Sequence, residues 1–368
     1  MKVFKEECDI KIFKKLFNLA NAPYCYPIDN FDYFSSLLGI ISDDHTMGIS
    51  LKKYLEIKIP STLSNLNYNR VVVRGNFERS KGLSSKEKRD KLFNYMRPSA
   101  YIQKDIAYVN CYPGIDYVFH YGNIIKSYFK LKNISIKVEH RLPTDVECWR
   151  AIIESELQNV PIVHTVIMGY VEGLQFISGD NKWNGSGNFL WKRTKTKSGD
   201  AILLGCKHTY WGEIAGRIVA FLLQSGVKRI IYSGKLGTLN SVLEPNKVIA
   251  TGNNSTLPNG KKIIWENIFD KINDNQVIHG NHITVPSVLQ ETKIWLSKSK
   301  NDFDFVDPEI GHMANAASIN KGEFSYFHIV SDNLSAKYDY DLSNERKIEV
   351  LNNRKILFRK IGNAIINS

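Results

Sequence analysis

The sequence predicts an α/β protein with a mainly parallel mixed sheet flanked by helices, preceded by a separate α+β module. From Pro161 onward, apolar strand-like segments alternate with amphipathic segments of helical length, as in parallel sheets covered by helices. The chain before this point has a different texture, with aromatic-rich pieces and a charged stretch. A chain of 368 residues that is 43% hydrophobic can also bury two cores. We therefore expect a module of undetermined fold over residues 1–155 and the α/β domain over residues 156–368.

The first module gives few local signals. Short strands are expected at Arg70–Arg74 and Ile134–Val138. The charged segment SSKEKRDKLFNYM is expected to be a helix that ends at Arg97, before Pro98.

The α/β domain is expected to begin with the buried strand PIVHTVIMG, followed by two strands in FLWKRTKTKSGDAILLGC joined at Ser198 and Gly199. A helix should follow in WGEIAGRIVAFLLQSGV, since its apolar residues share one face and Gly226 marks its end. The segment KRIIYSGKLGTL then predicts a strand that runs into a glycine-rich loop. Ligands of such sheets bind beyond the carboxyl ends of the strands.

Two groups of residues at strand ends are candidates for chemistry. The loop SGKLG has Gly234 and Gly237 on either side of Lys235, so its amides and the lysine could bind an anion, or it is a turn without a ligand. Asp307 and Glu309 end one strand-like run, just before a helix that begins near Ile310, and Asp332 follows another. Acids at the ends of neighbouring parallel strands would converge on one crevice, although a single strand-end aspartate is also a common helix N-cap.

Five segments, in order, resemble the nucleoside phosphorylase superfamily. They are SGKLG, KVIATGNNS, HGNHITVPSVL, VDPE and VSDNL. The superfamily includes purine nucleoside phosphorylases, methylthioadenosine/adenosylhomocysteine nucleosidases and AMP nucleosidases, and the resemblance covers roughly Pro161 to Ser368. It implies a phosphorylase-like fold and cleavage of an N-glycosidic bond, with no cofactor and no metal.

The resemblance also implies roles for individual residues. Glu309 corresponds to the glutamate that binds the ribose hydroxyls, beside Asp307, although Pro308 replaces the usual methionine. Asp332 corresponds to the aspartate that protonates the purine. The residues that match the remaining contacts are Asn281, His282 and Ile283 on the base, and Gly234 and Gly237 beneath the ribose and the nucleophile.

The chain departs from the phosphorylases where they bind phosphate. Tyr232 replaces an arginine, Lys235 replaces a serine, and GYVEG at the first strand has no arginine. Because lysine supplies only a point charge, the pattern favours hydrolysis. Glu172 of GYVEG is the candidate base for water, two residues from the expected position. His208 and Glu213, in GCKHTYWGE, lie on the segment that lines the nucleophile side in the superfamily, or have a structural role.

The partners follow from the charge and from the extra module. A formal net charge of +12 favours an anionic ligand, although much of it could be a solvated lysine surface. Arg74 and Arg79 lie near Gly75 in VVVRGNFER and either bind a substrate phosphate or end a solvated strand. AMP nucleosidases likewise place a domain before the catalytic one. The superfamily also suggests a homo-oligomer, unless the first module covers that contact.

Composition sets the remaining expectations. The longest apolar runs are far shorter than the roughly 20 residues that cross a bilayer, and the charged segment MKVFKEECDI does not look like a secretory signal; we expect a cytoplasmic protein. Five scattered cysteines without a CxxC pair predict neither disulfides nor zinc. Three functions stay open: a purine nucleosidase, a phosphate-dependent phosphorylase, or a non-catalytic protein that binds or senses nucleotides.

Overall fold

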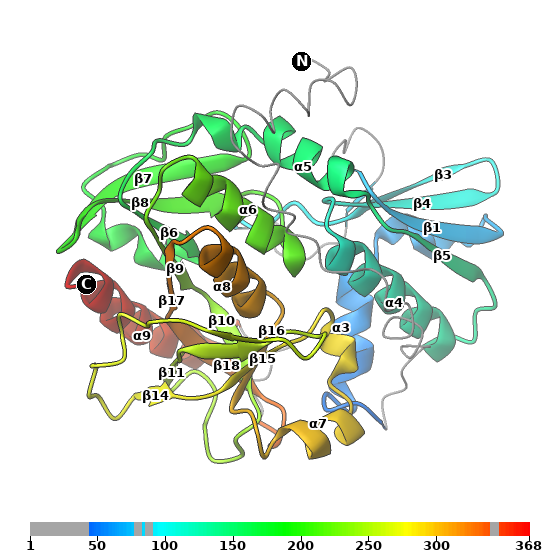
Figure 1. Cartoon of the computed structure of the whole chain (residues 1–368). Helices are drawn as coiled ribbons and strands as arrows, with labels where there is room; N and C mark the ends of the chain where they lie inside the picture. Colours follow the sequence, from blue (N-terminus) through cyan, green and yellow to red (C-terminus); the bar gives the residue numbers. More distant parts are fainter. Residues whose placement is uncertain (1–43, 77–82, 85–90, 339–345) are drawn as a thin grey trace.

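The strands form three sheets in a computed structural model that describes residues 44–76, 83–84, 91–338 and 346–368. A five-stranded sheet near the N-terminus has the order β2-β3-β4-β1-β5 (Figure 1). Its strands are β1 (Arg70–Gly75), β2 (Leu83–Ser84), β3 (Ser99–Gln103), β4 (Ile106–Cys111) and β5 (Lys137–Arg141). The central strand β1 is parallel to both β4 and β5. The two strands expected in this region are therefore present, with β5 a few residues later than predicted.

A second five-stranded sheet, in the order β17-β9-β6-β8-β7, is parallel except for the β7–β8 hairpin. Its strands are β6 (Thr165–Gly169), β7 (Phe189–Thr196), β8 (Gly199–Cys206), β9 (Arg229–Ser233) and β17 (Glu323–Tyr326). These match the predicted strands closely, because long apolar runs between turn residues fix their position.

The third sheet has eight strands in the order β13-β12-β15-β16-β10-β18-β11-β14, of mixed direction. The strands are β10 (Lys235–Thr238), β11 (Ile249–Thr251), β12 (Asn254–Thr256), β13 (Lys262–Ile264), β14 (Val277–His279), β15 (His282–Thr284), β16 (Phe305–Asp307) and β18 (His328–Asn333). Most are only three or four residues long. The prediction was wrong at SGKLG, where residues 235–238 form a strand rather than a loop.

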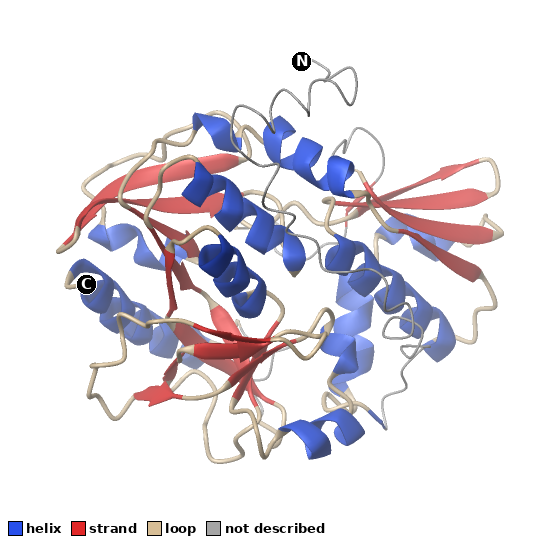
Figure 2. Cartoon of the chain, viewed as in Figure 1, coloured by secondary structure: helices blue, strands red, loops and turns tan. Residues whose placement is uncertain are grey.

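Helices cover these sheets, as Figure 2 shows. The α-helices are α3 (Ser50–Lys58), α4 (Ile115–Leu131), α5 (Asp145–Glu154), α6 (Glu213–Gln224), α7 (Lys293–Ser299), α8 (Ile310–Ile319) and α9 (Ile348–Ile366). Short 3₁₀-helices include η3 (Ser61–Asn65), η4 (Leu157–Asn159), η5 (Val171–Ile177) and η6 (Val288–Gln290). Helix α6 packs against α8, and α9 packs against η5 (Figure 1). The predicted α/β architecture with a mainly parallel mixed sheet is therefore confirmed.

One hydrophobic cluster joins the early and late parts of the chain. It includes Leu51, Val71 and Ile124 together with Ile218, Phe305 and Val330. The described strands before residue 156 form a sheet of their own, but their helices share this core with α6 and α8. The division at residues 155 and 156 stays a prediction.

Candidate functional site

Strand β10 lies between the two strands that carry the predicted acids. It is antiparallel to β16, with Gly237 paired to Val306. It is parallel to β18, with Gly237 paired to Asp332 after a register shift. A side chain at position 237 would meet Leu334 at 2.8 Å and the Asp332 carboxylate at 3.3 Å, so glycine is needed there for close packing. The two acids therefore flank one glycine-containing strand.

Glu309 faces a cavity of about 190 Å³. It directly precedes α8, and it accepts a 3.3 Å hydrogen bond from the Tyr232 hydroxyl. The cavity brings together five of the predicted residues, which are Glu172, His208, Gly234, Lys235 and Glu309. Burial, reinforced by the neighbouring Asp307 charge, raises the pKa of Glu309 well above its usual value. Burial therefore favours the neutral form of the Glu309 side chain.

Asp307 lies two residues before Glu309 and is a buried carboxyl neighbour of it. Its Oδ1 accepts the backbone amides of Glu309 at 3.0 Å and Ile310 at 2.8 Å and lies 3.2 Å from His282 Nε2. Burial acts against the charge, but the neighbouring His282 ring, and then His328, keep the pKa of Asp307 below its usual value. Its predicted contact with substrate finds no support in this geometry, because Asp307 is buried and holds the start of α8.

Four cationic side chains line the cavity. They are Lys58, Lys91, Arg97 and Lys235. Arg97 is 4% exposed, and its Nη1 donates to the Thr209 hydroxyl at 2.8 Å. The sequence motifs missed Arg97 because it comes from the first module, where no motif marks it. The prediction of a helix ending at Arg97 was wrong for its described residues. Residues 91–96 are irregular, and Met96 forms a β-bridge with His208.

Glu172 and His208 line the same cavity from different segments of the chain. One Glu172 oxygen accepts the Phe93 amide at 2.6 Å. His208 is 4% exposed and stacks on the Tyr112 ring with centroids 4.8 Å apart. One Glu172 oxygen is therefore engaged by the backbone, and the ring face of His208 is occupied by Tyr112.

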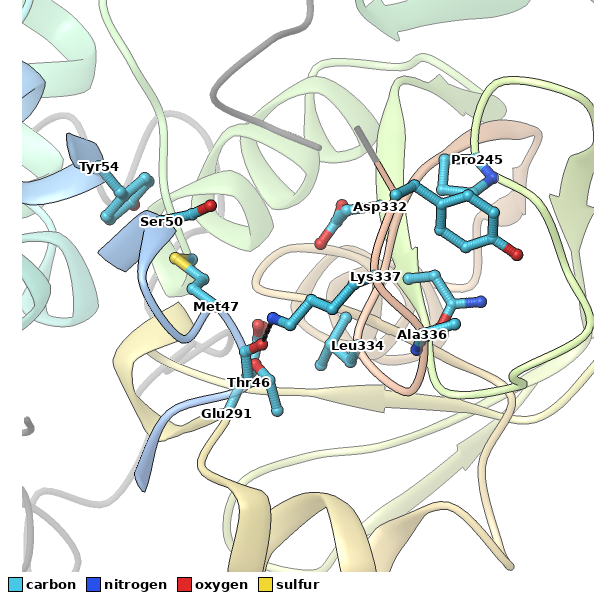
Figure 3. A pocket seen from close by; sticks show the side chains of 12 residues that line it. Thr46, Met47, Ser50, Tyr54, Pro245, Glu291, Asp332, Leu334, Ala336 and Lys337 are labelled. Atoms are coloured by element: carbon cyan, nitrogen blue, oxygen red, sulfur yellow. Dashed lines mark hydrogen bonds between the residues drawn. The ribbon is translucent and has the colours of Figure 1, made fainter. Parts of the chain in front are cut away.

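Asp332 lines a different cavity, shown in Figure 3. It lies there with Glu291 and Lys337, and Met47, Ser50 and Tyr54, before and within α3, lie across the cavity from Asp332. Burial, and then the Asp332 charge, raises the pKa of Glu291 well above its usual value. Asp332 and Glu309 line separate cavities, and β16 and β18 run in opposite directions on either side of β10; convergence of the two acids on one substrate stays a prediction.

The predicted base-binding segment lies on and beside β15. His282 is fully buried and hydrogen-bonds Ser255 Oγ through Nδ1 at 2.8 Å. The Asn281 amide donates to the Asp302 carbonyl at 3.2 Å. Ile283 packs against the cluster that contains Leu334, and Leu334 lines the Asp332 cavity. None of these three residues lines the Glu309 or the Asp332 cavity.

Glu213 has a structural environment. It begins α6, is fully buried, and bonds Arg217 at 2.8 Å and the Ile115 amide at 2.7 Å. Both carboxylate oxygens are thus occupied by protein, and Glu213 does not line the Glu309 cavity. Sequence reasoning placed it near the substrate because it follows the segment containing His208.

The structure describes one of the two arginines that were predicted to bind a substrate phosphate. Arg74 donates to the Asn110 side chain at 3.0 Å and to the Tyr101 hydroxyl at 2.8 Å, and it lies over the Tyr108 ring. Arg79 lies outside the described residues. Arg74 is thus held on the first sheet, and it lines neither the Glu309 nor the Asp332 cavity.

Two other kinds of site are not found in the part of the chain that the structure describes. No group of three or more histidine, cysteine, aspartate or glutamate residues there is arranged to hold a metal ion. No described helix is both long and apolar enough to cross a membrane.

Comparison with known proteins finds similar chains among the solved structures. No protein-family model matches the sequence, and no curated protein matches it significantly. The 5′-methylthioadenosine/S-adenosylhomocysteine nucleosidase of Campylobacter jejuni matches with 15% identity and a TM-score of 0.43, over 55% of this chain and 98% of that chain. A futalosine hydrolase mutant of Helicobacter pylori matches with 10% identity and a TM-score of 0.41, over 55% and 97%.

A purine nucleoside phosphorylase of Toxoplasma gondii matches with 12% identity and a TM-score of 0.42, over 57% of this chain and 92% of that chain. The proteins matched include the kinds that the five sequence segments resemble. Similarity at this level does not transfer an activity to this chain.

Proposed function

We propose that the chain cleaves the N-glycosidic bond of a purine nucleoside or nucleotide by hydrolysis. The observation that carries this proposal is that β10 lies between β16, which ends two residues before Glu309, and β18, which contains Asp332. Glu309 shares its cavity with Gly234, and Asp332 pairs with Gly237. These glycines are three residues apart, roughly 10 Å along a strand. One nucleoside lying across β10 would span that distance, with its ribose at Glu309 and its base toward Asp332.

The chemistry requires opposite charges at the two ends. As the bond between the ribose C1′ and the base nitrogen breaks, its electron pair moves to the base and positive charge develops on the ribose. Asp332 donates a proton to the departing base. Water adds to C1′ and loses its proton to Glu172, which lines the cavity. The Glu309 side chain holds the ribose hydroxyls from below.

A second candidate function is phosphorolysis. Arg97 and Lys235 line the same cavity as Glu309, so Arg97 supplies a guanidinium where Tyr232 replaces the arginine of the phosphorylases. Arginine binds phosphate with two parallel hydrogen bonds. In that reaction phosphate oxygen, rather than water oxygen, would attack C1′. A protein that binds nucleotides without cleaving them is the third candidate.

A base-release assay tests these alternatives. Purified protein is incubated with purine nucleosides and their 5′-monophosphates, with and without phosphate, and products are separated by chromatography. Free base without phosphate supports the nucleosidase, and release only with phosphate supports the phosphorylase. If no base is released but the nucleosides or nucleotides still bind, the result supports the protein that binds nucleotides without cleaving them. The variant Asp332→Asn is the control for contaminating enzymes, because it should lose the activity.

A further inference from the structure

A groove of about 860 Å³ adjoins the Glu309 cavity. Lys91, Tyr170 and Glu172 line both. Lys91 Nζ lies 5.2 Å from the centre of the Tyr170 ring. The three residues therefore form a shared border, and a ligand in the cavity can extend past Tyr170 into the groove.

The groove is built by α9 and η5. Leu351, Arg354, Lys355, Phe358 and Arg359 line it from α9, with the three- and four-residue spacing of one helix face. Phe358 stacks on Tyr170 with ring centroids 4.9 Å apart. A side chain at Gly173 would meet the Phe358 ring at 2.8 Å. Glycine there allows η5 and α9 to approach, so the floor of the groove is a packed aromatic surface.

The walls of the groove carry a positive charge. Five cations line it, which are Lys91, Arg346, Arg354, Lys355 and Arg359, against the single carboxylate of Glu172. One Glu172 oxygen already accepts the Phe93 amide. Arg354 is 8% exposed and is oriented by a 2.7 Å bond from Nε to Asn246, whereas Lys355 and Arg359 are exposed. A groove lined in this way favours an anion with several charges.

We propose that the ligand is a nucleotide with more than one phosphate group, whose ribose lies at Glu309 and whose phosphate chain extends into the groove along α9. This inference rests on the proposed function. Residues 354 and 359 are five positions apart, about 7.5 Å along a helix axis. Two or three linked phosphates cover such a length, and a single phosphate reaches one end of it.

Isothermal titration calorimetry without divalent metal tests the inference. The probes are adenosine, guanosine, their 5′-mono-, di- and triphosphates, and inorganic tripolyphosphate. The test variant is Lys355→Gln/Arg359→Gln, and the matched control is Lys262→Gln/Lys271→Gln, which removes two exposed charges from elsewhere. Glutamine keeps a similar helix propensity in α9, so both variants should fold.

We expect a triphosphate to bind at least about tenfold more tightly than the monophosphate, since each charge-assisted hydrogen bond contributes on this scale. The α9 variant should lose that gain and its tripolyphosphate binding while it keeps its affinity for the nucleoside. Equal affinity of mono- and triphosphates, or an equal loss in the control variant, would overturn the inference and leave the proposed function standing. Absence of all nucleoside and nucleotide binding would overturn both.

Discussion

The buried ion pair between Arg217 and Glu213 predicts a large and specific loss of stability. Arg217 is 1% exposed; it bonds Glu213 at 2.8 Å and also contacts Asp145, the first residue of α5. Glu213 in turn accepts the Ile115 amide at the start of α4. This network ties α6 to α4 and α5. Replacing Arg217 with methionine keeps an unbranched apolar stem and leaves Glu213 as a buried charge without its cation.

The expected cost of Arg217→Met is about 3–5 kcal/mol in the free energy of unfolding, the usual result of removing one partner of a buried pair. The double variant Glu213→Gln/Arg217→Met removes both charges, and the amide oxygen of the new glutamine side chain can still accept the Ile115 amide. We therefore expect the double variant to be more stable than the sum of the two single losses predicts, by about 1–3 kcal/mol.

Guanidinium unfolding followed by circular dichroism measures these free energies, and unchanged slopes show that the same surface is exposed. The matched control is Arg229→Met, because Arg229 bonds Glu323 at 2.6 Å and Glu323 is 55% exposed. That change should cost about 1 kcal/mol or less. Equal losses at positions 217 and 229, or strictly additive losses in the double variant, would refute the assignment of Glu213 to a structural network.

Four further outcomes follow from the site. Asp332→Asn should lower base release at least about a hundredfold by loss of the general acid, with an unchanged circular dichroism spectrum; near-wild-type release would remove Asp332 from the mechanism. Glu309→Gln should raise KM and lower kcat together, and steady-state kinetics that change in neither would exclude a ribose contact. Lys235→Gln should weaken phosphate binding in calorimetry at least about tenfold, and an unaltered affinity would remove this lysine from the anion site. Burial lowers the pKa of His328 to about 4, so the unfolded chain binds this proton first and the free energy of unfolding should fall by roughly 3 kcal/mol from pH 6.5 to 4; an equal fall in His328→Phe would contradict this.

The long apolar strands could be predicted from sequence, whereas the direction of the short ones could not. Strands β6 and β8 are buried along most of their length, and their composition marks them without any tertiary information. Strands β10 and β16 have four and three residues, so their pairing depends on partners distant in the chain. Because this pairing cannot be inferred from the sequence, residues 235–238 were expected to be a loop and the strands of the two acids were expected to be parallel neighbours.

The candidate cavity could be predicted in part. Glu309, Gly234 and Lys235 come from segments whose spacing is visible in sequence, and the structure brings them together. Arg97 and Lys91 could not be found in this way, because they reach the cavity from a part of the chain that no motif links to it. A basic residue before a proline carries no signal by itself, and tertiary contacts such as the hydrogen bond to Thr209 position Arg97.

Helix α4 has a consequence for synthesis of the chain. Thirteen of its 17 residues are buried, and its neighbours include α6 and the much later η6. At about 5–20 residues per second, the ribosome would need roughly 10 to 30 s to add the chain between α4 and η6. During that interval an apolar helix lacks part of its cover, so the nascent protein would be a substrate for chaperones until η6 emerges.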